Sequence, residues 1–195
     1  MEFTPEVKTE YETLFATCQI NPTRVTAVDA IITRVLANRA VYEAIGDPLN
    51  HIPWYFIAAI HNLETGLRFD RHFHNGDPLT ARTVRVPAGK PASGTPPFTF
   101  EESAIDALTE KGFHQKPAWP LAKMLFRMER YNGFGYRNKG INTPYLWSFS
   151  NQYTRGKFVA DGKFSLTAVS AQCGGATLLK RLEDRGLISI PLTES

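Results

Sequence analysis

The sequence has few cysteines and no long apolar run. Cys18 and Cys173 are its only cysteines in 195 residues, too few for a disulfide framework, and no Cys-x-x-Cys pair offers the usual ligands of a structural zinc site. A single bridge between them stays open, but we expect two buried thiols that behave as small apolar groups. No apolar stretch approaches the roughly 20 residues that span a bilayer. We therefore predict no insertion into a membrane.

The excess of one sign of charge over the other is also small. The formal net charge is +3 and the isoelectric point is about 8.9. The lysines and arginines are scattered, whereas a dedicated nucleic-acid binder shows a dense basic stripe. We predict no nucleic-acid partner. A mild positive bias does suit a polyanionic surface such as a bacterial cell wall.

The first residues do not have the pattern of a Sec signal peptide. Glu2 and Glu6 place acids where such a peptide is basic, and no continuous apolar stretch follows. We expect synthesis in the cytoplasm, and no cofactor.

The spacing of apolar residues predicts a mainly α (α+β) fold in one domain, residues 1–195. Prolines and glycines interrupt residues 69–100 every few positions, and there only Thr80–Val86 alternates like a strand, so we expect a small β-wing and long loop in this segment. Helices are expected at about 4–18, 23–45, 53–66, 100–108, 117–131 and 167–184, with a short element at 146–153.

The helix that begins near Pro53 carries a carboxylate at the end of an apolar stripe. Ile57, Ile60, His61 and Glu64 stand at i, i+3, i+4 and i+7 and share one face. Burial and the negative end of the helix dipole both favour the protonated form of Glu64. A carboxylic acid that keeps its proton near neutral pH is what a general acid for glycosidic cleavage needs. The alternative is an ordinary polar residue in a last turn.

Three short motifs resemble the active-site region of the lysozyme-like superfamily. Glu64-Thr65-Gly66-Leu67-Arg68-Phe69 is similar to the segment that follows the catalytic glutamate in goose-type lysozymes and lytic transglycosylases. Arg130-Tyr131-Asn132-Gly133 and Thr143-Pro144-Tyr145 resemble their Tyr-Asn-Gly and Pro-Tyr segments. The strings His-Asn-Leu-Glu-Thr-Gly at 61–66 and His-Asn-Gly-Asp-Pro-Leu at 74–79 together extend the resemblance to phage endolysins. The resemblance covers about residues 50–150. It implies a lysozyme-like fold and a muramidase with Glu64 as the acid. The wing lacks the glycine-rich run of those families.

Glycosidases usually pair the acid with a second carboxylate. Asp77, in the segment expected to form the wing, is the first candidate, although Asn-Gly-Asp-Pro is also good turn chemistry. Asp70 is the second candidate, and it or His74 can also contact a sugar. Glu101 and Glu102 suit a helix start better. A lytic transglycosylase needs no second carboxylate, because the 6-hydroxyl of its own substrate attacks.

Sugars stack on aromatic rings and bond to amides, and residues 131–153 are rich in both. We expect Tyr131, Asn132 and Tyr145 to hold the glycan, although aromatics here can also form a satellite core. His61, one turn before Glu64, is expected to bond Glu64 or a sugar.

A competing hypothesis is a zinc-dependent wall hydrolase. His61, Glu64, His72 and His74 lie within 14 residues, but the second helical histidine of a His-Glu-x-x-His motif is absent, so we expect no metal. A chitinase and a glycan-binding module without activity are further alternatives. Our leading prediction is a monomeric muramidase that acts on the peptidoglycan glycan strand, outside the cytoplasm, after release or export.

Overall fold

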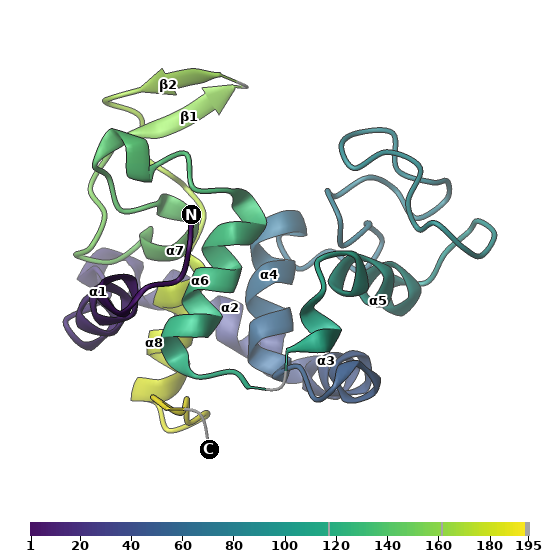
Figure 1. Ribbon diagram of the computed structural model, residues 1–195, viewed down its shortest axis with the longest axis horizontal. Coiled ribbons are helices and arrows are strands. Elements are labelled where there is room, and N and C mark those ends of the chain that lie inside the picture. Colours follow the sequence, from purple (N-terminus) through teal and green to yellow (C-terminus); the bar gives the residue numbers. More distant parts are fainter. Residues whose placement is uncertain (117, 161, 194–195) are drawn as a thin grey trace. The chain divides into compact units, whose positions relative to one another are not determined.

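The computed structural model describes residues 1–116, 118–160 and 162–193. Over these residues the chain is mainly helical, with a small antiparallel sheet of two strands, in agreement with the predicted mainly α (α+β) class (Figure 1). The elements are α1 (Pro5–Ala16), α2 (Val25–Ala37), α3 (Arg39–Gly46), α4 (Trp54–Thr65), α5 (Phe100–Glu110), α6 (Leu121–Asn132), α7 (Pro144–Trp147), β1 (Lys157–Ala160), β2 (Lys163–Ser165) and α8 (Gly175–Asp184), with short 3₁₀ turns at Pro22–Arg24, Asp47–Leu49, Phe113–Gln115 and Arg137–Lys139.

The chain forms two compact units. Unit 1 contains Met1–Ile32 and Trp119–Ser195, and unit 2 contains Thr33–Ala118. Unit 2 is therefore an insertion between the two segments of unit 1.

Unit 1 is a helical cluster in which α1 packs on α6, α6 on α7, and α7 on α8. Thr4 caps α1 by accepting a hydrogen bond from the Val7 amide, and Pro5 suits the first helical position. Glu129 of α6 is buried; it accepts a hydrogen bond from the Tyr11 hydroxyl and two from Arg137. These bonds compensate the cost of a buried carboxylate and join α1 to α6.

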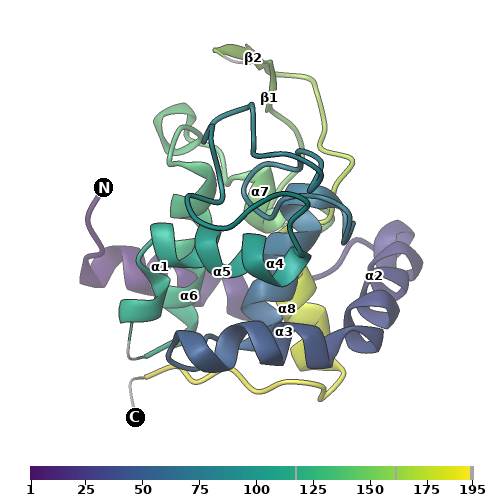
Figure 2. The same ribbon diagram turned by 90° about the vertical axis from the view of Figure 1, so that its right-hand side faces the viewer.

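Unit 2 is built around α4, which packs on α3, while α3 also contacts α5. Its core is apolar and includes Ile45, Phe56, Ile60 and Leu108, none of them exposed. Figure 2 shows these three helices with the loop of residues 66–99 above them.

The prediction of one continuous helix over 23–45 is wrong in one respect, because the helix is interrupted at Asn38. The Asn38 side chain donates a hydrogen bond to the Arg34 carbonyl, and the Asn38 backbone leaves the helical region at φ −115° and ψ 15°. An asparagine amide competes with the backbone for hydrogen bonds, so α2 ends and α3 begins there.

Two other helices begin later than predicted. Helix α6 begins at Leu121 after Pro120, and the predicted start at Pro117 lies outside the described residues. Helix α8 begins at Gly175 rather than Thr167, although it ends just before Gly186 as expected.

The β-strand predicted over Thr80–Val86 is not formed. Thr83 instead bonds within the loop: its backbone and side chain bond Lys90, and its hydroxyl donates to the Pro87 carbonyl. Pro87 also removes a donor that a strand needs. The only sheet among the described residues joins β1 and β2, where we had expected no element.

A membrane-crossing helix would need greater length and apolarity than any helix in the described part of the chain has.

Candidate active site around Glu64

Helix α4 holds Glu64 in its last turn. The residues from Phe56 to Leu63 are all buried, and Glu64 is half-buried. Ile57 and Ile60 are not exposed at all, so the apolar stripe that leads to Glu64 is confirmed. Gly66 ends the helix with a left-handed φ of 65°, a conformation that favours glycine.

A cation stands at the C-terminal end of α4. The Arg34 guanidinium donates hydrogen bonds to the carbonyls of Gly66 and Leu67, each at 3.2 Å. This contact satisfies carbonyls beyond the helix end and offsets the negative end of the helix dipole. Burial and the helix dipole, considered from the sequence, did not reveal this positive charge at the end of α4.

The loop lies against the backbone of Glu64. A Cβ atom added at Gly76 would lie 3.3 Å from the Glu64 carbonyl oxygen, and Gly76 has a left-handed φ of 76°. The turn that carries Asp77 is therefore next to the last turn of α4. The absence of a side chain at Gly76 permits this close approach.

Both Asp77 oxygens are engaged within the loop. Oδ2 accepts hydrogen bonds from the Val84 and Arg85 amides at 2.9 Å, and Oδ1 pairs with the Arg85 guanidinium at 2.7 Å. Burial raises the pKa of Asp77, but the two amides and the guanidinium outweigh burial, so the pKa lies below 3.8. These contacts give Asp77 a role in ordering the loop.

Asp70, the second candidate carboxylate, is exposed. It pairs with Arg68 through two hydrogen bonds and approaches Arg71 at 3.6 Å. Glu102, by contrast, forms a capping box with Thr99 at the start of α5, as its sequence position predicted.

His61 is enclosed in the core of unit 2. Its Nδ1 lies 3.0 Å from the Tyr42 hydroxyl and its Nε2 lies 3.2 Å from the Arg68 carbonyl oxygen. The rings of Phe69 and Phe100 pack around it. Both ring nitrogens therefore have protein partners, and neither is left for the predicted bond to Glu64 or a sugar. Burial lowers the pKa of His61 to about 4.

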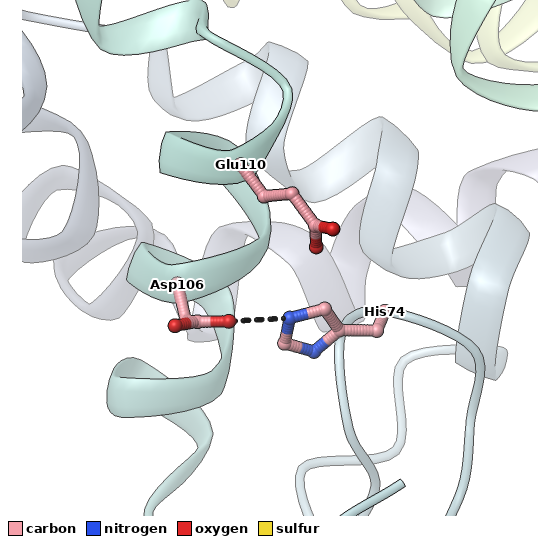
Figure 3. A group of neighbouring side chains, drawn as sticks. All are labelled: His74, Asp106 and Glu110. Atoms are coloured by element: carbon pink, nitrogen blue, oxygen red, sulfur yellow. Dashed lines mark hydrogen bonds and ion pairs between the residues drawn. The ribbon is translucent and has the colours of Figure 1, made fainter. Parts of the chain in front are cut away.

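The four residues of the zinc hypothesis do not gather around one point. His72 bonds Ser103 through Nδ1 and the Ala81 carbonyl through Nε2. Among the residues with a described placement, His74 groups instead with Asp106 and Glu110 of α5, and the potential ligand atoms of the three lie within 4.8 Å of one another (Figure 3). Burial lowers the pKa of His74, although Asp106 raises it.

Two of the three predicted glycan contacts line one pocket of unit 1. Asn132 and Tyr145 lie in a pocket of about 350 Å³, and Tyr131 is half-buried outside its lining. Sequence reasoning missed Lys157 and Phe158 of β1, which also line this pocket. The short strand β1 gave no signal of its own, because four residues are too few for a clear alternation.

A larger pocket of about 560 Å³ also belongs to unit 1. Arg24 and Phe149 lie in its lining, where the Arg24 guanidinium stands 4.7 Å from the Phe149 ring centroid. None of the predicted site residues contributes to it.

Comparison with protein-family models, with curated proteins and with solved structures gave no match. The lysozyme-like resemblance therefore remains an inference from the short motifs alone.

Proposed function

We propose that this protein cleaves the glycan strand of peptidoglycan at the β-1,4 bond between its amino sugars, with Glu64 as the general acid. The observation that carries the proposal is the position of Glu64, half-buried at the end of a buried helix and next to an ordered loop. A carboxyl group that is partly shielded from water at the end of a buried helix suits proton transfer to a leaving oxygen.

The reaction begins when the Glu64 carboxyl donates its proton to the glycosidic oxygen. The C–O bond breaks, positive charge develops on the sugar ring, and Glu64 is left as a carboxylate. A hydroxyl group then attacks the sugar carbon and gives its proton to a carboxylate. In a muramidase this hydroxyl belongs to water, and Asp77 or Asp70 is the predicted second carboxylate.

The contacts of Asp77 favour a second candidate, a lytic transglycosylase. Because both Asp77 oxygens already have partners in the loop, Asp77 is poorly placed to hold a water. A substrate whose own 6-hydroxyl attacks removes the need for a second carboxylate, and Glu64 then serves as acid and base in turn.

The predicted glycan contacts belong to unit 1. The Asn132 amide can bond sugar hydroxyls, and the Tyr145 ring can stack on a sugar face. Both residues line the same pocket. Tyr131 is the third predicted contact. Such an enzyme reaches its substrate only after release or export from the cytoplasm.

The first experiment measures clearing of purified peptidoglycan in the presence of EDTA by the wild type, by Glu64→Gln and by Glu101→Gln. Glu101 is an exposed glutamate of α5 and provides the matched control. We expect Glu64→Gln to lower the rate by about 10²–10⁴-fold, because the amide cannot donate the proton in the same way, and Glu101→Gln to leave it unchanged.

Mass spectrometry of the products separates the two candidates. A hydrolase leaves a reducing sugar, whereas a transglycosylase leaves an anhydro sugar lighter by one water. Clearing by Glu64→Gln at the wild-type rate would contradict the proposal. Release of oligomers from chitin but not from peptidoglycan would replace it with a chitinase.

A further inference from the structure

The hydrogen bonds around Ser103 determine which nitrogen of His74 carries a proton. The Ala81 carbonyl can only accept, so His72 donates from Nε2, and a neutral His72 accepts at Nδ1. The Ser103 hydroxyl also accepts from the Phe73 amide. With both imidazoles neutral, the single Ser103 proton goes to His72, and His74 donates to Ser103 from Nδ1 at 3.2 Å.

This arrangement leaves the lone pair of His74 Nε2 directed at Asp106. The Asp106 Oδ2 atom lies 2.9 Å from Nε2, and neither atom supplies a proton when His74 is neutral. Either a proton on Nε2 or a metal cation at this point joins the two groups. Glu110 follows Asp106 by one helical turn, and its carboxylate faces the same nitrogen (Figure 3).

We propose that His74, Asp106 and Glu110 bind one divalent transition-metal cation of the Zn²⁺ class, which links the loop of residues 66–99 to α5. The proposal is independent of the function proposed for Glu64. One imidazole nitrogen and two carboxylates are a ligand set that Zn²⁺ accepts, with a fourth position left for water.

The geometry fits such an ion after a small adjustment. Ligand atoms about 2.0–2.1 Å from a tetrahedral Zn²⁺ lie about 3.3 Å from one another. The separation between His74 and Asp106 must widen by a few tenths of an ångström. Glu110 has the freedom to move closer, since its side chain is 36% exposed.

Groups behind the ligands hold two of them in place. The Ser103 hydroxyl orients His74 through Nδ1, and the Ala92 amide donates to Asp106 Oδ1 at 3.2 Å. Such outer contacts fix the tautomer and orientation of metal-ligating histidines and carboxylates. Lys90 pairs with Glu110 Oε1 at 3.1 Å, so it offsets one of the two negative charges and leaves the second carboxylate oxygen as the ligand.

A path for the ion exists on the side of Asp106. This residue contributes to a pocket of about 360 Å³ in unit 2, together with Pro91, Gly94 and Ile105. His74 itself is buried, so an ion reaches it from this side through the carboxylates.

The test is a calorimetric titration of chelator-treated, metal-free protein with ZnCl₂ near pH 7, repeated with CoCl₂ and followed by visible absorption. We expect one equivalent of Zn²⁺ per chain. Glu110→Gln and Asp106→Asn should each weaken binding by about tenfold or more, because each removes a ligand. Glu101→Gln, on the same helix and outside the cluster, should bind as the wild type does.

A second control excludes a surface histidine. His51 is exposed and lies 3.5 Å from Asp47, so His51→Ala should leave the affinity unchanged. Circular dichroism identifies a variant that fails to fold. If Asp106→Asn does so, the more exposed Glu110→Gln decides the test. No Zn²⁺ binding by the folded wild type, equal binding by folded Glu110→Gln, or loss of binding in His51→Ala would overturn the proposal.

Discussion

The His61 imidazole is a polar group in an aromatic setting, and its two hydrogen bonds make this position tolerable. The Arg68 carbonyl accepts from Nε2, so Nδ1 accepts from the Tyr42 hydroxyl, and the ring is neutral with both nitrogens satisfied. A proton on Nδ1 would reverse the Tyr42 bond, so that the hydroxyl accepts, and would place a charge among apolar rings. The consequence is a dependence of stability on pH.

We predict that the free energy of unfolding falls as the pH drops from about 6.5 to about 4. The folded-state pKa of His61 is about 4, below the ordinary value of 6.5, so the unfolded chain binds the proton more tightly in this range. The stabilising contribution is fully present above pH 6.5 and is lost as the pH falls through 4, for a total of up to roughly 3 kcal/mol.

Urea unfolding between pH 4 and pH 7 measures this contribution, and the slope against pH should be smaller for His61→Gln. Proton NMR follows the ring directly, with the His61 signal assigned through its absence in His61→Gln. A His61 signal that titrates near pH 6.5 would contradict the prediction.

Residue-level reasoning from the sequence had a clear limit at the histidines. The apolar stripe leading to Glu64 follows from the period of the helix, because those residues are close in the sequence. The partner of His74 does not follow from any local pattern, because Asp106 lies 32 residues away in the sequence. The sequence therefore grouped His74 with its sequence neighbours, whereas tertiary structure groups it with α5.

At the scale of elements, the contact between α7 and the start of α8 depends on a glycine. A Cβ atom at Gly174 would lie 2.3 Å from the Leu146 carbonyl oxygen and 2.7 Å from the Trp147 amide nitrogen. The Gly174 amide also donates to the Ser148 carbonyl at 3.1 Å. Backbone meets backbone here, so no side chain fits between the two segments.

We predict that Gly174→Ala lowers the free energy of unfolding by about 3 kcal/mol, because neither backbone segment can yield easily. Gly135→Ala is the matched control, since its added Cβ would meet only the Phe158 ring at an ordinary 3.6 Å, and it should cost less than about 1 kcal/mol. Equal chemical denaturation curves for the two variants would show that the Gly174 contact relaxes.

Element boundaries were predictable where local chemistry decides them. Gly66 stops α4, and Thr99 with Glu102 starts α5, because caps act within one helical turn. The segment at Thr80–Val86 shows the opposite case. Its alternation suits a strand, but a strand needs a partner, and Asp77 and Thr83 hold this segment as a loop instead. A local sequence pattern does not show which distant segments pair with each other.

At the scale of the whole molecule, both cysteines lie in unit 1. Cys18 follows α1 and Cys173 precedes α8, and both are buried thiols outside any disulfide bond. Burial raises the pKa of Cys173 to about 12 and raises the pKa of Cys18 as well. The thiolate is the reactive form of cysteine. Both thiols therefore react slowly, because they are buried and because their raised pKa values keep them protonated.

We predict that both thiols react with a disulfide reagent at neutral pH roughly a hundredfold more slowly in the native protein than in urea, where two equivalents should react. The absorbance of the released thiolate measures both rates. One fast thiol in the native protein would contradict the burial of that cysteine, and no reactive thiol in urea without reductant would show a bridge between them.

The insertion of unit 2 into unit 1 has a consequence for synthesis on the ribosome. When Ala118 leaves the exit tunnel, every residue of unit 2 is available, whereas α1 of unit 1 still lacks α6, its packing partner. Translation adds only about 5–20 residues per second, so the wait lasts seconds. During that interval the apolar face of α1, with Tyr11 and Phe15, is a nascent-chain segment that chaperones can engage. The order of translation thus differs from the order of assembly: the middle of the chain is ready first, and its two ends join last.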